Sequence, residues 1–223
     1  MNCCPAMKRK TSEPRPFGVM PLLSSPRGGL RPFKRPEPPD GGDRGNLLLR
    51  LLAFNTNLQE IHGFRLLSDI KPEDYKAFKP QGMTALYDAA YSGVSATLEM
   101  AKRLIQQDFE VNGCVYIITD GMDNASTMTP KAIADKIQDA VSGEEIESLI
   151  TVLVGLINPN DKYAKDVRHA LTTFQVEANL TQFVDAGDAT AQRLAKLAQF
   201  VSQSISAQSQ ALGTGAPSQP LQF

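Results

Sequence analysis

Between residues 46 and 205, short apolar runs alternate with longer segments in which apolar residues recur every three or four positions. An apolar run of four to eight residues bounded by turn residues is typical of a strand that is buried on both faces. The second pattern is typical of a helix with one buried face. This alternation predicts a Rossmann-like α/β fold, with a mostly parallel sheet and helices on both faces.

The boundaries of the expected elements follow from the same patterns. Strands are predicted at residues 47–54, 62–67, 114–119, 149–156 and 181–184, the second of them at the sheet edge. Thr129 followed by Pro130 is typical of an N-cap with proline in the first helical position. Thr84, Asn160 and Asp188 are expected to begin the other three helices, which would end near residues 105, 177 and 205.

Residues 1–45 differ in composition from the remainder of the 223-residue chain. They contain nine Lys or Arg against four Asp or Glu, which leaves 14 against 20 in the rest, and nine of the 15 prolines. Because proline cannot continue a helix or pair in a central strand, we interpret residues 1–45 as a disordered basic arm. Residues 206–223, rich in Gln, Ser, Gly and Pro, are interpreted as a disordered tail. The domain is therefore predicted to span residues 46–205.

The cysteines and the apolar segments argue against several classes of protein. Cys3 and Cys4 lie in the arm and Cys114 opens an apolar run, so their spacing fits neither a zinc site nor a redox pair. No apolar run reaches membrane-spanning length, and residues 1–10 lack the apolar segment of a signal peptide. Basic residues interleaved with proline predict no nucleic-acid surface. The expectation is a cytoplasmic protein without a membrane span.

Two segments with oxygen-bearing side chains follow predicted strands. Residues 119–124, Thr-Asp-Gly-Met-Asp-Asn, come directly after an apolar run, which places Asp120 at the carboxyl end of a buried strand. Open α/β sheets bind their ligands at that end. Residues 82–89, Gly-Met-Thr-Ala-Leu-Tyr-Asp-Ala, open a helix, so Thr84 lies at a second such junction and is also its expected N-cap. Thr84 and Asp120 are therefore candidate metal ligands.

These segments, 82–89 and 117–124, resemble the second and third parts of the metal-ion-dependent adhesion site of von Willebrand factor A domains. The similarity extends from about residue 45 to residue 205, and residues 51–56 resemble the second strand of that family. The resemblance implies a Rossmann-like domain that binds Mg²⁺ or Mn²⁺ at the top of the sheet and usually binds proteins without catalysis. It also implies that Thr84 binds the metal through its hydroxyl and Asp120 directly or through water.

The first part of that site, Asp-x-Ser-x-Ser at the end of a central first strand, is absent from the chain. Residues 17–23 are not expected to replace that strand, because Pro21 would remove a hydrogen bond from a strand that must pair on both sides. We therefore expect the first strand and its helix to be missing. Three explanations fit: residues 1–45 are a misread or truncated start in place of the native strand, which we favour; a partner chain supplies the strand; or the domain is degenerate and rearranged.

The missing part weakens the predicted metal site. Mg²⁺ demands near-octahedral oxygen coordination, so Thr84 and Asp120 alone predict weak or absent binding of Mg²⁺ or Mn²⁺. The predicted function is a non-enzymatic protein-binding module, whose protein ligand offers an acidic side chain in the metal-dependent family. The chain is predicted to contain no catalytic residues. A solvent-exposed turn is expected for the polar residues after Met122: Asp123, Asn124 and Ser126.

Two alternatives from other functional classes are kept. One is a metal-independent structural or assembly module, which the missing first part of the metal site favours. The other is a Mg²⁺-dependent phosphatase of the haloacid dehalogenase type, which also places an Asp after an apolar strand. The phosphatase is less favoured, because its motif needs a second Asp where this chain has Met122.

Overall fold

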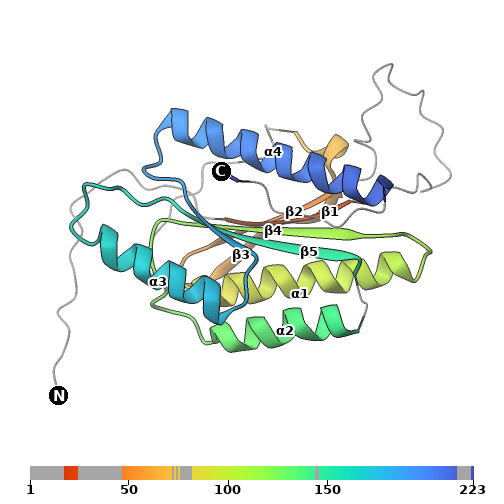
Figure 1. Cartoon of the computed structure of the whole chain (residues 1–223), viewed down its shortest axis with the longest axis horizontal. Coiled ribbons are helices and arrows are strands. Elements are labelled where there is room, and N and C mark those ends of the chain that lie inside the picture. Colours follow the sequence, from red (N-terminus) through yellow and green to blue (C-terminus); the bar gives the residue numbers. More distant parts are fainter. Residues whose placement is uncertain are drawn as a thin grey trace.

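The computed structural model describes residues 18–24, 47–71, 73, 75, 82–143, 146–214 and 222–223, with only the backbone described for 18–24 and 208–214. A six-stranded sheet lies at the centre, in the order β3-β2-β1-β4-β5-β6 (Figure 1). Its strands are β1 (Gly18–Ser24), β2 (Leu48–Phe54), β3 (Leu58–Leu66), β4 (Asn112–Thr119), β5 (Ser148–Gly155) and β6 (Gln182–Asp185). The helices are α1 (Leu86–Ile105), α2 (Pro130–Ser142), α3 (Ala164–Glu177) and α4 (Ala191–Thr214), and a 3-10 helix, Leu67–Asp69, follows β3.

The sheet is mixed in direction. β4, β5 and β6 are parallel neighbours. β1 is antiparallel to both β2 and β4, and the edge strand β3 is antiparallel to β2. Consequently β2, β4, β5 and β6 run in one direction and β1 and β3 in the other. The α/β class and the edge position of β3 are confirmed, but the prediction of mostly parallel pairing is correct only for β4 to β6.

Strand β1 lies within the segment that the sequence predicted to be a disordered arm. It pairs with β4 along its whole length, with Gly18 opposite Ile118. Toward β2 the paired residues are 18–19 and 22–23, so Met20 and Pro21 fall in an interruption of that ladder. Pro21 has no N–H to donate, and the interruption accommodates it. The prediction that the first strand is missing was therefore wrong. The rest of the predicted arm, including residues 25–45, where a first helix would lie, is outside the described residues.

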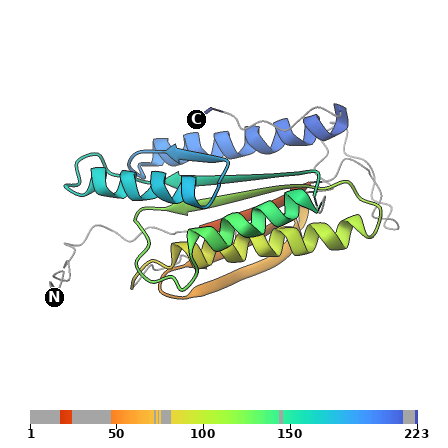
Figure 2. The same cartoon turned by 60° about the horizontal axis from the view of Figure 1, so that its bottom comes forward.

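Helices cover both faces of the sheet, as predicted (Figures 1 and 2). α1, α2 and α3 lie on one face, and α4 lies on the other. Val115, Ile117 and Leu153 belong to the core beneath α1, α2 and α3, whereas Tyr116 and Val152 belong to the core beneath α4. Successive side chains of a strand point to opposite faces. A strand that has helices on both faces is therefore apolar along its length, which explains the continuous apolar runs of β4 and β5.

Helix α1 packs closely against β4. A Cβ atom on Gly113 of β4 would lie 2.9 Å from Thr97 Cγ2 of α1, so glycine permits this approach. The helix buries one face, as its periodicity predicted, and the buried residues are Leu86, Ala89, Ala90, Gly93, Val94, Thr97, Leu98 and Ala101. This close packing fixes the first turn of α1 beside the carboxyl end of β4.

The helix boundaries agree with the sequence in part. Thr129 caps α2 as predicted, its Oγ1 accepting the N–H of Ala132 at 3.3 Å. α4 begins after Thr190 and continues to Thr214, so residues 206–214 of the predicted tail are helical. Their Ala, Gln and Leu residues favour helix, and no proline interrupts them before Pro217. Although α4 has 24 residues, no helix in the described part of the chain is both long and apolar enough to span a membrane.

Candidate functional site

Loops of the chain meet at the carboxyl ends of β2 and β4. The N–H of Met83 donates to Thr56 Oγ1 at 2.9 Å. The N–H of Ala85 donates to the carbonyl of Asn55 at 2.8 Å. These bonds hold the loop before α1 against the turn after β2. The loop that follows β4 also contacts the loop before α1.

Side chains of the loop after β4 cap helix α1. Asp123 Oδ1 accepts the N–H of Leu86 at 2.8 Å and that of Tyr87 at 3.4 Å. Ser126 Oγ accepts the N–H of Tyr87 at 2.9 Å and that of Asp88 at 3.1 Å, and donates to Asp123 Oδ1 at 2.5 Å. The first N–H groups of a helix have no partner within it, so these side chains satisfy them. The carboxylate also interacts favourably with the positive end of the helix dipole.

Further bonds run in both directions between these segments. The N–H of Thr84 donates to Asn124 Oδ1 at 2.6 Å, and the N–H of Asn124 donates to the Thr84 carbonyl at 3.0 Å. From the helix, Asp88 Oδ1 accepts the N–H of Thr127 at 2.9 Å and that of Met128 at 2.7 Å. We call all these bonds between the loop after β4 and the start of α1 the interloop clasp. It fixes the relative position of the two sequence motifs.

The interloop clasp corrects two predictions. Thr84 does not cap α1, because the helix begins at Leu86 and its N-cap residue, Ala85, makes no side-chain cap bond. The side chains at 123, 124 and 126 do not form a merely solvent-exposed turn, because they accept backbone N–H groups of residues 84–88. Ser126 and Tyr87 are 39 positions apart. A cap supplied from such a distance leaves no local signal in the sequence of the helix.

The structure places both predicted metal ligands on the segments that the interloop clasp joins. Asp120 directly follows β4 and is partly buried. Thr84 is 9% exposed and lies two residues before α1. The two residues therefore belong to neighbouring loops at one edge of the sheet, as the sequence predicted. Their role as metal ligands stays a prediction.

Because β1 is antiparallel to β4, its carboxyl end lies beside the start of β4. Ser24 is paired with Asn112, the first residue of β4, whereas Gly18 is paired with Ile118 near the end of β4. Six residue steps of about 3.3 Å separate the two ends of β1 by about 20 Å. The carboxyl end of the central strand therefore lies away from the loop that carries Asp120.

The oxygen atoms described at this edge do not fit a complete magnesium site. Within the described ranges, no three Asp, Glu, His or Cys residues are grouped so that they could hold a metal ion. The carboxylates of Asp88 and Asp123 already accept backbone N–H groups in the interloop clasp. Thr84 and Asp120 by themselves supply fewer ligands than the near-octahedral coordination of Mg²⁺ requires.

Tyr87 connects the interloop clasp to helix α3. Its ring centroid lies 4.6 Å from that of Phe174. Burial raises the pKa of the Tyr87 phenol above its ordinary value, and the negative charges of Asp123 and Glu177 act in the same direction. The phenol therefore remains neutral to a higher pH than an exposed tyrosine.

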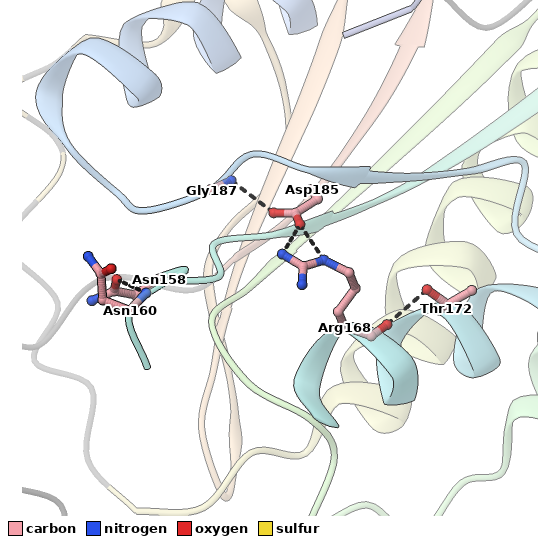
Figure 3. A network of polar contacts seen from close by, with 6 residues as sticks. All are labelled: Asn158, Asn160, Arg168, Thr172, Asp185 and Gly187. Atoms are coloured by element: carbon pink, nitrogen blue, oxygen red, sulfur yellow. Dashed lines mark hydrogen bonds and ion pairs between the residues drawn. The ribbon is translucent and has the colours of Figure 1, made fainter. Parts of the chain in front are cut away.

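A second polar network lies at the carboxyl end of β6 (Figure 3). Arg168 of α3 donates through Nε and Nη2 to Asp185 Oδ2, at 2.7 and 2.6 Å. Asp185 Oδ1 accepts the N–H of Gly187 at 3.0 Å. The sequence pattern did not indicate this pair, although an Asp at the end of an apolar strand could have signalled it. Since the carboxylate is already paired with a guanidinium, the network fixes the loop after β6.

Three methionines are exposed on the loops of the interloop clasp, and we call them the methionine rim: Met83, Met122 and Met128. Their exposed fractions are 52%, 38% and 39%. The polar side chains at positions 123, 124 and 126 bond inward to backbone N–H groups of residues 84–88, whereas these apolar side chains reach solvent. Methionine is flexible and polarisable, and it is frequent on surfaces that bind varied partners.

Comparisons of the chain with protein-family models, with curated proteins and with solved structures find no match. The assignment to a family therefore depends on the resemblance of residues 82–89 and 117–124. What the structure establishes is an α/β domain with three parallel neighbouring strands, and two loops that their own side chains lock together at one sheet edge.

Proposed function

We propose that the chain is a non-enzymatic protein-binding module of the von Willebrand factor A type that works without the complete metal site of that family. The observation that carries this proposal is the methionine rim on the interloop clasp, at the edge where open α/β sheets bind ligands. The proposed partner is a protein, because exposed methionines on adjoining loops offer flexible apolar contacts of the kind that protein-binding surfaces use.

The arrangement of hydrogen bonds favours binding without metal. In the metal-dependent family, an acidic side chain of the protein ligand completes the coordination of the ion. Here Asp123 and Ser126 hold α1 directly, so the two loops need no ion between them to keep their positions. Thr84 and Asp120 remain the pair through which residual Mg²⁺ or Mn²⁺ binding would act.

Thermal unfolding with and without Mg²⁺ or Mn²⁺ tests the metal part of the proposal. A ligand that binds only the native state stabilises it by about 1.4 kcal/mol at ten times its Kd. We expect no rise in Tm at millimolar metal, in the wild type or in Asp120→Ala and Thr84→Ala variants. A rise in the wild type that either variant abolishes would overturn metal independence and leave protein binding standing.

Site-specific cross-linking tests the binding part. A photoreactive amino acid at Met122 should give an adduct of protein size in cells, and the adduct should persist in lysates treated with EDTA. The matched control is the same amino acid at Val141, which is 61% exposed at the far end of α2. Identical products from both positions, or no product from position 122, would overturn the proposal that the methionine rim binds a protein.

A further inference from the structure

The final described residues pack against helix α4. Phe223 is partly buried and contacts the core between α4 and the sheet. Its ring centroid lies 5.4 Å from that of Phe200, at an interplanar angle of 84°. Lys196 Nζ lies 4.4 Å from the centroid of the Phe223 ring. Both views of the molecule place residue 223 beside α4 (Figures 1 and 2).

The contact joins Phe223 to the first half of α4. Lys196 and Phe200 precede the end of α4, Thr214, by 18 and 14 residues. A small hollow remains between residues 222 and 223 and the four side chains of α4 that face them: Lys196, Gln199, Phe200 and Gln203. These four recur at intervals of three and four positions, so they share one face of the helix. We call them the α4 aromatic pocket.

The pocket has an apolar floor and a polar rim. Phe200 is only 4% exposed, whereas Lys196, Gln199 and Gln203 are exposed. Among the described residues, Lys196 makes no ion pair with a carboxylate, and its recorded contact is the face of the Phe223 ring. The pocket therefore places the ammonium group of Lys196 over the Phe223 ring and the ring of Phe200 beside it.

Both contacts of the Phe223 ring require an aromatic side chain. The negative face of a ring attracts an ammonium group. The perpendicular arrangement with Phe200 is the edge-to-face geometry that ring quadrupoles favour. A leucine in the same place would fill part of the volume but would lose both interactions. The chemistry of the pocket thus selects for an aromatic residue over an aliphatic one.

We propose that the α4 aromatic pocket is a binding site for an aromatic side chain, and that Phe223 occupies it in cis. The pocket lies on the α4 face of the sheet and shares no residue with the methionine rim, so the inference is independent of the proposed function. An occupant tethered to the same chain competes with free peptide at an effective concentration of roughly millimolar. Removal of the Phe223 ring therefore opens the pocket to the same segment supplied in trans.

Fluorescence anisotropy with a labelled peptide of residues 215–223, Gly-Ala-Pro-Ser-Gln-Pro-Leu-Gln-Phe, tests this inference on the full chain. The peptide should bind a Phe223→Ala chain several-fold more tightly than it binds the wild type, because the competing ring is gone. Lys196→Gln in the Phe223→Ala chain should weaken binding several-fold through loss of the cation. A peptide with Leu in place of its Phe should bind far more weakly than the original.

The matched control for the lysine is Lys131→Gln in the Phe223→Ala chain, because Lys131 lies on α2 and pairs with Asp135. Peptide binding should be unchanged by it. Hydrogen exchange of the wild type and Phe223→Ala chains provides a second measurement, and exchange across residues 196–203 should be faster without the ring. Equal peptide affinity for both chains, indifference to Lys196→Gln, or unchanged exchange would each overturn the proposal.

Discussion

Replacement of Asp123 by alanine tests the interloop clasp most directly. The change removes the acceptor of the Leu86 and Tyr87 N–H groups, and it frees Ser126 Oγ from one of its bonds. Loss of an N-cap side chain costs typically about 1 kcal/mol, and hydrogen bonds to a charged group contribute about 1.5–3 kcal/mol. Since Asp123 is only partly buried, water replaces part of this loss. We expect the free energy of unfolding to fall by about 2 kcal/mol.

In a chain of 223 residues, about 2 kcal/mol corresponds to a decrease in Tm of about 4–8 °C. Urea unfolding followed by far-UV circular dichroism measures the free energy, and a thermal scan measures Tm. Asp123→Asn keeps an oxygen acceptor without the charge, so its loss should be about half as large. Asp135→Ala is the matched control, because Asp135 forms an exposed pair with Lys131 at 2.8 Å and should cost about 0.5 kcal/mol or less.

The bonds that Asp123 and Ser126 share predict non-additive effects. Both side chains accept the N–H of Tyr87, so the double variant with Ser126→Ala should lose less stability than the two single variants together. If Asp123→Ala were no less stable than Asp135→Ala, the carboxylate would not hold α1. The physical account of the interloop clasp would then be refuted.

Three further predictions concern other parts of the fold. Gly82→Ala should lower the free energy of unfolding by about 1–3 kcal/mol in a urea titration, because Gly82 has a φ of 93° and its added Cβ would lie 2.5 Å from Thr56 Oγ1. Gly63→Ala, where the nearest atom would lie at 3.6 Å, is the control and should cost less. Burial raises the pKa of Tyr116 above its ordinary 10.0, so the folded chain keeps this phenol protonated at a pH where the unfolded chain ionises. Tyr116 therefore leaves the free energy of unfolding unchanged below that pH and lowers it as the pH rises further. Tyr116→Phe should make the alkaline decline in urea midpoints less steep, and an equally steep decline in the variant would contradict the assignment. The backbone N–H groups of residues 18–24 should exchange slowly with solvent, as those of a paired strand do, and full exchange within seconds would exclude β1 from the sheet.

The elements that could be predicted from sequence are those whose signals are local. Three signals are contained in the segment whose structure they predict. They are the apolar run of β4, the periodicity of α1 and the Thr129–Pro130 cap of α2. The helix at residues 206–214 was missed because the Gln and Ser content was interpreted as low complexity, although those residues tolerate helix.

Contacts between distant segments explain the larger differences between the predictions and the structure. Pro21 argues against a central strand only where the hydrogen-bond ladder is complete on both sides, whereas the ladder toward β2 is interrupted at that residue. The sequence places Asp123 and Ser126 after a strand but contains no indication that they cap a helix more than 30 residues upstream. Such a cap exists only when packing brings the two loops together.

The sequence by itself determined the α/β class, the positions of β2, β4, β5 and the first three helices within a few residues, the start of α4, and the location of Thr84 and Asp120 on loops beside buried strands. Apolar patterning is enough for this, because burial on one face or on two imposes a period on the chain. Only the tertiary structure decided the direction of β1, the partners that cap α1, and the contact of Phe223 with α4. Each depends on hydrogen bonds or ring contacts between segments far apart in the chain, and such contacts form only once the sheet and helices have packed.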